Sequence, residues 1–361
     1  FTWVKDENDW NSDYVAVINS DPKDRGYGSL VSTLPVGFND INAHHSEHRF
    51  HEIKELFVNG FSGGRSFIVD LNDPKHPKLK KTFTNINQYT FPHSFERLPN
   101  GNVLATFQTV GQGNNQVGGL VEISSEGDFV RSSNASDPKV AKFIRPYSLA
   151  ILPEIDRVVS TSADMKQKDL SNVVQVWSLS NLSLIKTMVL EPGPRGNEHF
   201  DPAEPRVLKD GKTVLISTFF CGLYRVKDIE SRAPSIEWVY SFDFNDKYDC
   251  AIPVVNGDYW IQAVGSKTAI VSLNVSNPSN PTKAFELKFN TGEWPHWIAL
   301  EPGGNRLVVT GNNRLKNTLL IVDVDKKTGK MSFDRSFRDK RTGKLGFSFD
   351  RFKWPHGNTD S

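Results

Sequence analysis

The sequence "FPHSFERLPNGNVLATF", residues 91–107, joins two short apolar stretches through a Pro-Asn-Gly turn and carries a histidine directly after its proline. Apolar stretches of this length around such a turn predict a β-hairpin. Related hairpins recur as "RPYSLAILPEIDRVVST" at 145–161, "DPAEPRVLKDGKTVLIST" at 201–218 and "GEWPHWIALEPGGNRLVVTG" at 292–311. A repeat of about fifty residues is typical of architectures built from many copies of one unit.

A second hairpin, rich in β-branched residues and alternating in polarity, follows each of these, as at 65–83 and 269–287. Each unit is therefore predicted to hold four strands. Four-stranded units arranged radially form a β-propeller, and the length of 361 residues corresponds to seven blades. We predict an all-β, seven-bladed propeller that forms a single domain over residues 1–361.

The two ends of the chain are predicted to share one blade. Residues 13–35 read as an outer hairpin without an innermost strand, and "FSFDRFKWPHGN" at 347–358 can supply that strand. We therefore expect the ring to be closed by N-terminal strands pairing with the C-terminal strand, since closure removes an exposed sheet edge.

Charge and apolar runs limit the partners. Lys and Arg total 43 against 42 Asp and Glu, so we expect no nucleic acid and no membrane as partner. No stretch approaches the roughly 18 apolar residues of a membrane helix. A leader could have been removed before Phe1. We expect a periplasmic or secreted protein, with the cytoplasm as the alternative, and the sequence does not predict the oligomeric state.

The chain has two cysteines, Cys221 and Cys250. A disulfide, two free core thiols and a substrate-handling thiol are all compatible with their positions. Of these we expect free core thiols, since unpaired cysteine behaves as a small buried apolar residue.

In a propeller the first residue of each innermost strand, repeated around the ring, lines one mouth of the central channel. In the hairpins quoted above, this residue lies eleven positions before the start of the second strand. The same count in the other blades, with the histidine of "KWPHGN" in the last, gives a ring of seven residues: His356, His45, His93, Tyr147, Ala203, Asp249 and His296.

Four neighbouring members of this ring are histidines, out of nine in the chain. Imidazole suits zinc, copper, iron and nickel, whereas a set without thiolates or clustered carboxylates disfavours calcium and magnesium. We predict a metal site formed by His45, His93, His296 and His356. The alternative is that these side chains only bind solvent and backbone.

The other histidines near this strand are expected to play lesser roles. His44, directly before the ring position, could bind the metal or act as an orienting or proton-transfer group. For His48 and His51, surface exposure or packing between blades is the expectation, and His76 is expected to be exposed.

Polar residues on the other side of the ring are the candidate catalytic groups. Tyr147, Asp249 and Glu204 leave a polar face where a substrate could meet the metal. Asp249 or Glu204 could act as a general base or orient a ligand histidine. Structural ion pairing is the alternative for both carboxylates.

At these residues the sequence resembles the selenium-binding protein and methanethiol oxidase family. The resemblance rests on "DYVAVINSDPKDRGYGSLVSTLPVGFNDINAHHSEHRF" at 13–50, with further similar segments at 63–83, 91–107 and 172–190. It implies a seven-bladed propeller with a copper site built from histidines, which oxidises a small thiol with O₂ to an aldehyde, hydrogen peroxide and sulfide. His44, His45 and His93 match the histidine motifs of the family.

The chain departs from the family pattern in three ways. The cysteine-containing loop that follows the His-His pair is replaced by "SEHRFHEIKEL" at 46–56, so we expect no selenium binding. Asp350 stands at the place of the C-terminal histidine of the family, so His356 would have to act instead. The chain is also shorter than typical members, which leaves the substrate open.

The sequence therefore predicts a copper-dependent oxidase of a small, thiol-like substrate, with zinc or iron as the alternative metal. A propeller hydrolase, lactonase or lyase with a metal ion as Lewis acid is the second interpretation. A third is a non-catalytic metal-binding scaffold, because a propeller fold does not determine a function.

Overall fold

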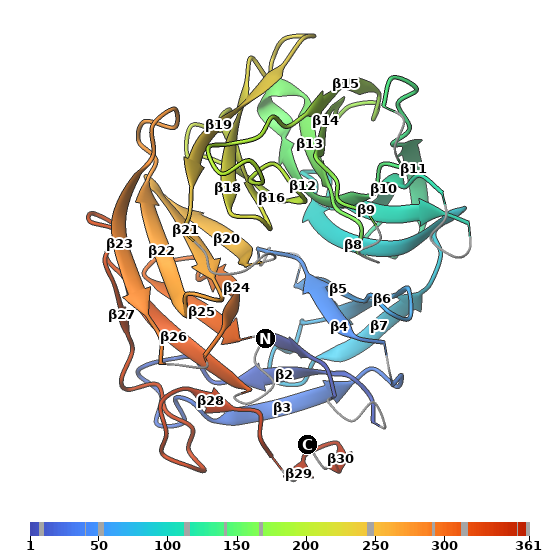
Figure 1. The fold of residues 1–361 in the computed structure, drawn as a ribbon. Helices are drawn as coiled ribbons and strands as arrows, with labels where there is room; N and C mark the ends of the chain where they lie inside the picture. Colours follow the sequence, from blue (N-terminus) through green and yellow to red (C-terminus); the bar gives the residue numbers. More distant parts are fainter. Residues whose placement is uncertain are drawn as a thin grey trace.

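The computed structural model describes residues 1–6, 11–39, 41–49, 54–111, 116–140, 143–165, 169–243, 249–290, 293–311, 317–351 and 353–358. These residues form seven sheets arranged as blades around a central channel, together with a small two-stranded sheet near the C-terminus (Figure 1). The prediction of an all-β, seven-bladed propeller is confirmed. Apart from the short 3-10 helix η1 (Pro153–Ile155), the described residues contain no helix, and none of them therefore forms a helix that could cross a membrane.

The first four blades follow one another along the chain. The first holds β1 (Thr2–Val4), β2 (Tyr14–Ile18) and β3 (Leu30–Pro35). The second holds β4 (Ala43–Ser46), β5 (Glu55–Gly60), β6 (Arg65–Asp70) and β7 (Lys78–Phe83). The third holds β8 (Tyr89–Arg97), β9 (Val103–Val110), β10 (Gly119–Ile123) and β11 (Phe129–Asn134). The fourth holds β12 (Pro146–Leu152), β13 (Arg157–Ser162), β14 (Val173–Ser178) and β15 (Leu184–Val189).

The remaining blades complete the ring. The fifth holds β16 (Pro202–Val207), β17 (Val214–Thr218), β18 (Gly222–Lys227) and β19 (Ser235–Ser241). The sixth holds β20 (Cys250–Asn256), β21 (Tyr259–Val264), β22 (Ala269–Asn274) and β23 (Thr282–Lys288). The seventh holds β24 (Pro295–Leu300), β25 (Arg306–Gly311), β26 (Thr318–Val324) and β27 (Met331–Phe333). Three short strands follow: β28 (Phe347–Ser348), β29 (Lys353–Trp354) and β30 (Gly357–Asn358).

The core lies between the blades rather than at the centre of the ring. Among the described residues, a cluster of buried apolar side chains fills the space between each pair of neighbouring blades. Strand β2 shows the principle, since Val15 packs toward the second blade while Tyr14 and Ala16 pack toward the seventh. Successive side chains of a strand point to opposite faces, so strands covered on both sides are apolar almost throughout.

The predicted pairing of the two chain ends is not confirmed. Strand β1 itself pairs with β2 and lies against β4, so it occupies the innermost place of the first blade. Because β1 takes that edge, the C-terminal segment goes elsewhere: β28 pairs with β26, and β29 pairs with β30. The ends still meet through side chains, since Trp354 packs against Tyr14 with ring centroids 4.9 Å apart.

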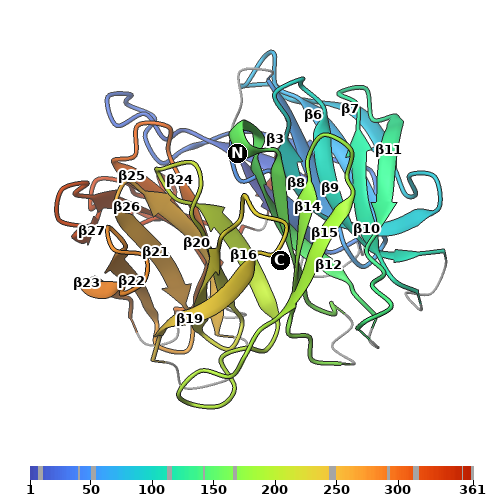
Figure 2. The ribbon, with the colours of Figure 1, turned by 90° about the horizontal axis from the view of Figure 1, so that it is seen from above.

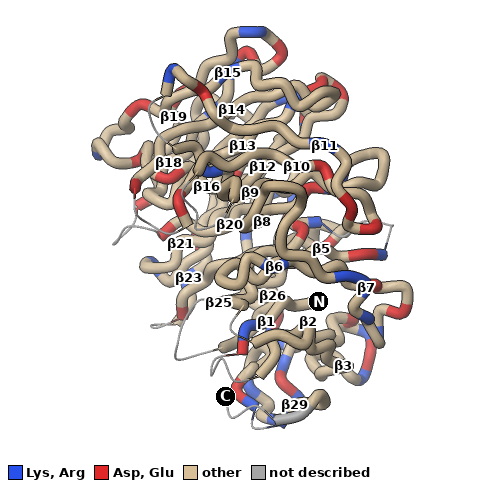
Figure 3. Tube along the Cα trace, turned by 90° about the vertical axis from the view of Figure 1, so that its right-hand side faces the viewer, with Lys and Arg blue, Asp and Glu red and all other residues tan. Residues whose placement is uncertain are grey.

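Figure 2, turned by 90° from Figure 1, shows the ring from its edge, with most of the blue to green blades on one side and the yellow to red blades on the other. Basic and acidic residues are interspersed along the chain trace in Figure 3. This mixture agrees with the near-zero net charge of the sequence.

Candidate metal centre

In the second to seventh blades, the pairing of the innermost strand with the neighbouring strand is interrupted at one point. The register shifts there by one residue, as at a β-bulge, and the residues inside the break are freed from regular pairing. The breaks lie between Ala43 and Ser46, Pro92 and Phe95, Pro146 and Leu149, Pro202 and Glu204, Cys250 and Pro253, and Pro295 and Trp297. The bulged residues are therefore His44, His45, His93, Tyr147, Ala203, Ala251 and His296, with Ser94, Ser148 and Ile252 beside them.

Three of these histidines come together. His44, His45 and His93 can each offer a ring nitrogen such that the three nitrogens lie within 4.8 Å of one another. The Nε2 atoms of His44 and His93 are 3.0 Å apart, and the ring centroids of His45 and His93 are 4.1 Å apart. His45 and His93 are buried, and His44 is half-buried.

Main-chain and side-chain partners fix how two of these rings are turned. The N–H at Nδ1 of His93 donates to the carbonyl oxygen of Tyr147, at 2.7 Å. With the proton held at Nδ1, Nε2 of His93 carries the lone pair that faces His44. Ser94 Oγ lies 3.2 Å from Nδ1 of both His93 and His45. Such partners of the non-ligating nitrogen are usual around metal-binding histidines.

Two further buried residues support the backbone of the cluster. Asn59 Oδ1 accepts a hydrogen bond from the main-chain N–H of His45 at 2.6 Å, and its amide donates to the carbonyl oxygens of Pro92 and His93. Asp13 Oδ2 accepts from the N–H of Ala43, directly before His44, at 2.7 Å. Sequence reasoning missed both residues because they lie outside the repeated ring position.

Burial keeps the histidines neutral. Desolvation lowers the pKa of His44 to about 3 and that of His296 to about 4. The pKa values of His45, His48 and His93 are also well below their ordinary range, first through burial and then through neighbouring positive charge. Neutral imidazole is the form that binds metal ions, so the cluster is ready to do so at neutral pH.

A second group of possible donors lies beside the first and shares His45. It consists of His45, His48 and Glu204, with donor atoms within 4.8 Å of one another. Tyr147 joins the two groups, since its hydroxyl lies 3.4 Å from His45 Nε2. His48 is neither exposed nor packed between neighbouring blades, which corrects the expectation: its ring stacks on Trp297 of β24 in the seventh blade and lies 3.5 Å from Glu204 of β16 in the fifth. His51 lies outside the described residues.

The other two predicted ligands are placed differently. His296 occupies the bulge of β24 and lies near enough to lower the pKa of His44, yet it is not part of either donor group. His356 is wrong as a member of the ring: its Nδ1 lies 2.6 Å from Thr33 Oγ1 of β3, and its ring packs on Tyr14 and Trp354. The reason is that β1, rather than the C-terminal segment, provides the innermost strand of that blade.

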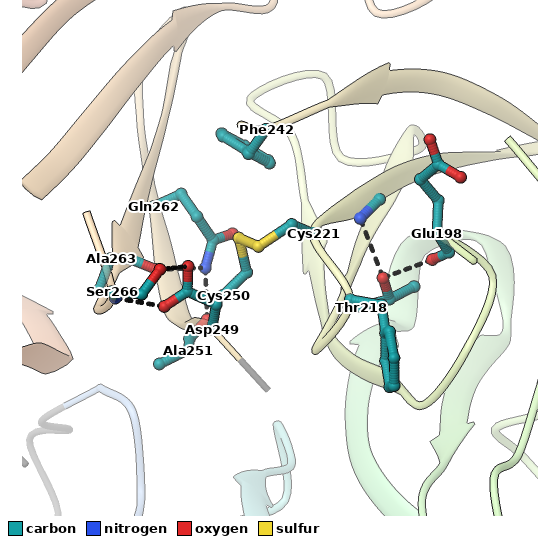
Figure 4. Close-up of a disulfide and its surroundings, with 12 residues drawn as sticks. Glu198, Thr218, Cys221, Phe242, Asp249, Cys250, Ala251, Gln262, Ala263 and Ser266 are labelled. Carbon is teal, nitrogen blue, oxygen red and sulfur yellow. Dashed lines mark hydrogen bonds between the residues drawn. A yellow bond between two sulfur atoms is a disulfide. The ribbon is translucent and has the colours of Figure 1, made fainter. Parts of the chain in front are cut away.

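Asp249 is also not at the predicted ring position. Its carboxylate accepts hydrogen bonds from the N–H and hydroxyl of Ser266, which lies in the turn between β21 and β22 (Figure 4). The bulge of this blade holds Ala251 instead, two residues later. Asp249 therefore holds a turn together and is not a candidate base.

The two cysteines form a disulfide, which corrects the expectation of free thiols. Cys221 and Cys250 have Cα atoms 5.1 Å apart, both are fully buried, and Figure 4 shows the bond between the fifth and sixth blades. His76 is exposed, as expected, and pairs with Asp73.

The first donor group fits a metal ion. Two nitrogens bound to one tetrahedral ion at about 2.0–2.1 Å lie roughly 3.3 Å apart, close to the 3.0 Å between His44 Nε2 and His93 Nε2. Neutral nitrogen donors without thiolates suit copper, zinc or iron.

The comparisons with known proteins agree with this arrangement. No family model matches the chain. Over 122 residues the chain is 33% identical to the methanethiol oxidase of Hyphomicrobium sp. The resemblance to the methanethiol oxidase family is confirmed. The matched stretch is 33% of this chain and spans only 27% of the length of that enzyme.

Solved structures share the propeller. A hypothetical selenium-binding protein from Sulfolobus tokodaii superimposes with a TM-score of 0.73 at 14% identity, over 90% of this chain and 86% of that one. The periplasmic gluconolactonase of Pseudomonas aeruginosa gives 0.64 at 13% identity, over 92% and 94% of the two chains. At these identities the likeness shows the fold alone.

Proposed function

We propose that this protein is a copper-dependent oxidase of the methanethiol oxidase type, which uses O₂ to oxidise a small thiol-like substrate. The observation that carries the proposal is the buried group of three neutral histidines, with the Nε2 atoms of His44 and His93 facing each other at 3.0 Å. The local resemblance to a methanethiol oxidase supports the same reading.

Copper is the proposed metal because an all-imidazole set binds Cu²⁺ more tightly than the other divalent ions of its row. Bound there, copper would supply one-electron chemistry with O₂. His44, His45 and His93 would hold it, with the orientation of His93 set by the carbonyl oxygen of Tyr147. Zinc or iron in the same place is the alternative.

Tyr147 is the proposed proton donor of the site. Burial and the nearby charge of Glu204 keep its pKa well above the ordinary value, so its hydroxyl stays protonated at neutral pH. The hydroxyl lies 3.4 Å from His45 Nε2, beside the donor group. It can therefore orient or protonate an oxygen or sulfur atom that binds there.

The proposed partners are a small-molecule substrate and O₂, with neither nucleic acid nor a membrane. We further propose a periplasmic or secreted location. The buried disulfide between Cys221 and Cys250 supports it, because disulfides persist mainly in oxidising compartments.

A metal-dependent hydrolase, lactonase or lyase is the second candidate, and Glu204 favours it. Burial raises the pKa of this carboxyl group, and its Oε1 atom is buried without a hydrogen-bond partner among the described residues. A carboxylate of this kind beside a Lewis-acid metal could act as a general base.

Loading metal-free protein with Cu²⁺ or Zn²⁺ separates these candidates. The proposal expects O₂ uptake with a small thiol, and release of sulfide and hydrogen peroxide, for the copper form alone. Hydrolysis of a lactone by the zinc form, without thiol oxidation by the copper form, would replace the proposal with the second candidate. Metal binding without either activity would leave a metal-binding scaffold.

A further inference from the structure

The second donor group has a feature that the first lacks, an unpaired carboxylate oxygen. Oε2 of Glu204 accepts from Ser148 Oγ and from Arg206 Nη1, both at 2.8 Å. Oε1 of the same carboxylate is buried and has no hydrogen-bond donor among the described residues. Leaving such an oxygen unpaired in the interior is unfavourable, so a native structure almost always provides a partner.

Protonation does not provide that partner. A proton on Oε1 would turn it into a donor, yet the nearest ring nitrogen of His48 is placed at Oε2, at 3.5 Å. A cation or a water molecule is therefore required. His45 and His48 offer ring nitrogens within 4.8 Å of the carboxylate, which gives the two nitrogens and one oxygen that divalent zinc takes in open sites.

We propose that His45, His48 and Glu204 form a second metal-binding site, next to the group of His44, His45 and His93, which takes a divalent ion of the Zn²⁺ or Cu²⁺ class. His45 serves both groups as the imidazolate, which binds one ion through each nitrogen after its N–H proton has passed to solvent and Ser94 Oγ has moved away from Nδ1. In this role Glu204 holds an ion rather than a proton.

The surroundings hold the donors in place and tolerate the added charge. The ring of His48 stacks on Trp297, with centroids 5.0 Å apart and planes 11° apart, and burial keeps His48 neutral. Of the two carboxylate oxygens of Glu204, Arg206 bonds only to Oε2, which leaves Oε1 for an ion. Nη2 of Arg206 lies 3.2 Å from Nδ1 and 3.5 Å from Nε2 of His48, so an ion bound to His48 takes the place of this guanidinium contact. The carboxyl group of Glu96 lies near enough to interact electrostatically with both Arg206 and Glu204, and it offsets part of the positive charge of Arg206.

Metal stoichiometry tests this site without any enzyme assay. Metal-free protein is loaded with excess Zn²⁺, freed of unbound ion on a desalting column and measured by mass spectrometry of the metal. We expect two equivalents for the unchanged protein. Glu204→Gln keeps the acceptor for Arg206 and removes the free carboxylate oxygen, and His48→Phe keeps the stack on Trp297, so each should retain one equivalent.

The control is His199→Phe, which changes another buried histidine that packs on an aromatic ring but lies outside both groups, and it should keep two equivalents. Thermal melting shows which variants are folded. One equivalent in the unchanged protein overturns the second site whatever the variants do. Two equivalents in folded Glu204→Gln and His48→Phe also overturn it, because these side chains would then bind no ion. The loss of both equivalents in either variant overturns it as well, because all the donors would then belong to one metal centre.

With Cu²⁺ in place of Zn²⁺, two ions that share His45 should couple magnetically. The electron paramagnetic resonance signal of the fully loaded protein should then fall well below that of two isolated Cu²⁺ ions, and Glu204→Gln should restore the full signal of one. A signal of two independent ions would contradict the shared donor.

Discussion

The N–H at Nδ1 of His93 donates a hydrogen bond of 2.7 Å to the main-chain carbonyl oxygen of Tyr147 in the next blade. The first donor group thus depends on the backbone of Tyr147, whereas any chemical role of this residue depends on its hydroxyl. A side-chain substitution can separate the two contributions, because it leaves the carbonyl in place.

Tyr147→Phe should therefore keep the metal and lose turnover. We expect unchanged copper content and a fall in kcat of about 100-fold, the usual size of a proton-transfer contribution. Copper analysis and steady-state O₂ uptake measure the two quantities. Loss of copper in the variant would show that the hydroxyl holds the site together, and an unchanged kcat would remove Tyr147 from the chemistry.

Asn59→Ala should weaken metal binding although Asn59 offers no ligand. It removes the acceptor for the N–H of His45 and the donor to the carbonyl oxygens of Pro92 and His93. Loss of such supporting contacts typically lowers metal affinity 10–100-fold. Competition with a chelator of known affinity gives the value. Asn256→Ala, which removes a buried amide bonded to Gly304, is the control and should leave the affinity unchanged.

The lowered histidine pKa values predict how the metal-free protein responds to acid. His44 binds a proton near pH 6.5 when unfolded but only near pH 3 when folded, so its contribution to stability is complete above pH 6.5 and is lost as the pH falls toward 3. Asp13, whose pKa burial raises to about 6, acts in the opposite direction. The contribution of His44 to the pH dependence of stability is therefore obtained by comparing the unchanged protein with a variant that lacks this histidine.

Between pH 6.5 and 4, the free energy of unfolding should fall less steeply in His44→Gln than in the unchanged metal-free protein. Denaturant titrations at several pH values measure the two slopes, and His76→Ala, at an exposed site, should match the unchanged protein. Equal slopes in His44→Gln would mean that His44 is not buried in the neutral form.

The disulfide should contribute to stability and not to the metal site. For cysteines 29 residues apart, loop closure predicts a loss of about 3–4 kcal/mol in the free energy of unfolding when both are replaced by serine. Urea titration checks this value, and copper content should stay the same. The unfolded, unreduced protein should show no titratable thiol; two thiols would restore the earlier expectation of unpaired cysteines.

The repeat of the hairpins was enough to predict the propeller, because each blade repeats the same pair of hairpins, with apolar strands separated by turns. Counting along the repeat also placed His93, Tyr147, Ala203 and His296 at the bulges. The count failed at Asp249 because the turn from Asn256 to Tyr259 is shorter than in the other blades, which moves the bulge to Ala251.

Contacts between distant strands could not be read from the repeat. His48 meets Glu204 from another blade, and Asn59 bonds to the strand of His93. His48 has no equivalent in the pattern. Asn59 does have equivalents, since Thr106 and Thr161 also accept a hydrogen bond from the bulge of their own blade and donate one to the bulge of the next blade, but only the folded ring shows these contacts. The same holds for His356, whose place depends on which end of the chain provides the innermost strand.

Copper content and thiol-dependent O₂ uptake of His93→Ala, compared with His356→Ala, test the central claim most directly. His93 lies in the donor group, whereas His356 packs on the outer side of the first blade against Thr33 and Tyr14. We expect His93→Ala to lose the Cu²⁺ resonance signal of the first donor group together with the activity, and His356→Ala to keep both. A folded His93→Ala protein that retains that signal and the oxidase activity would contradict the account.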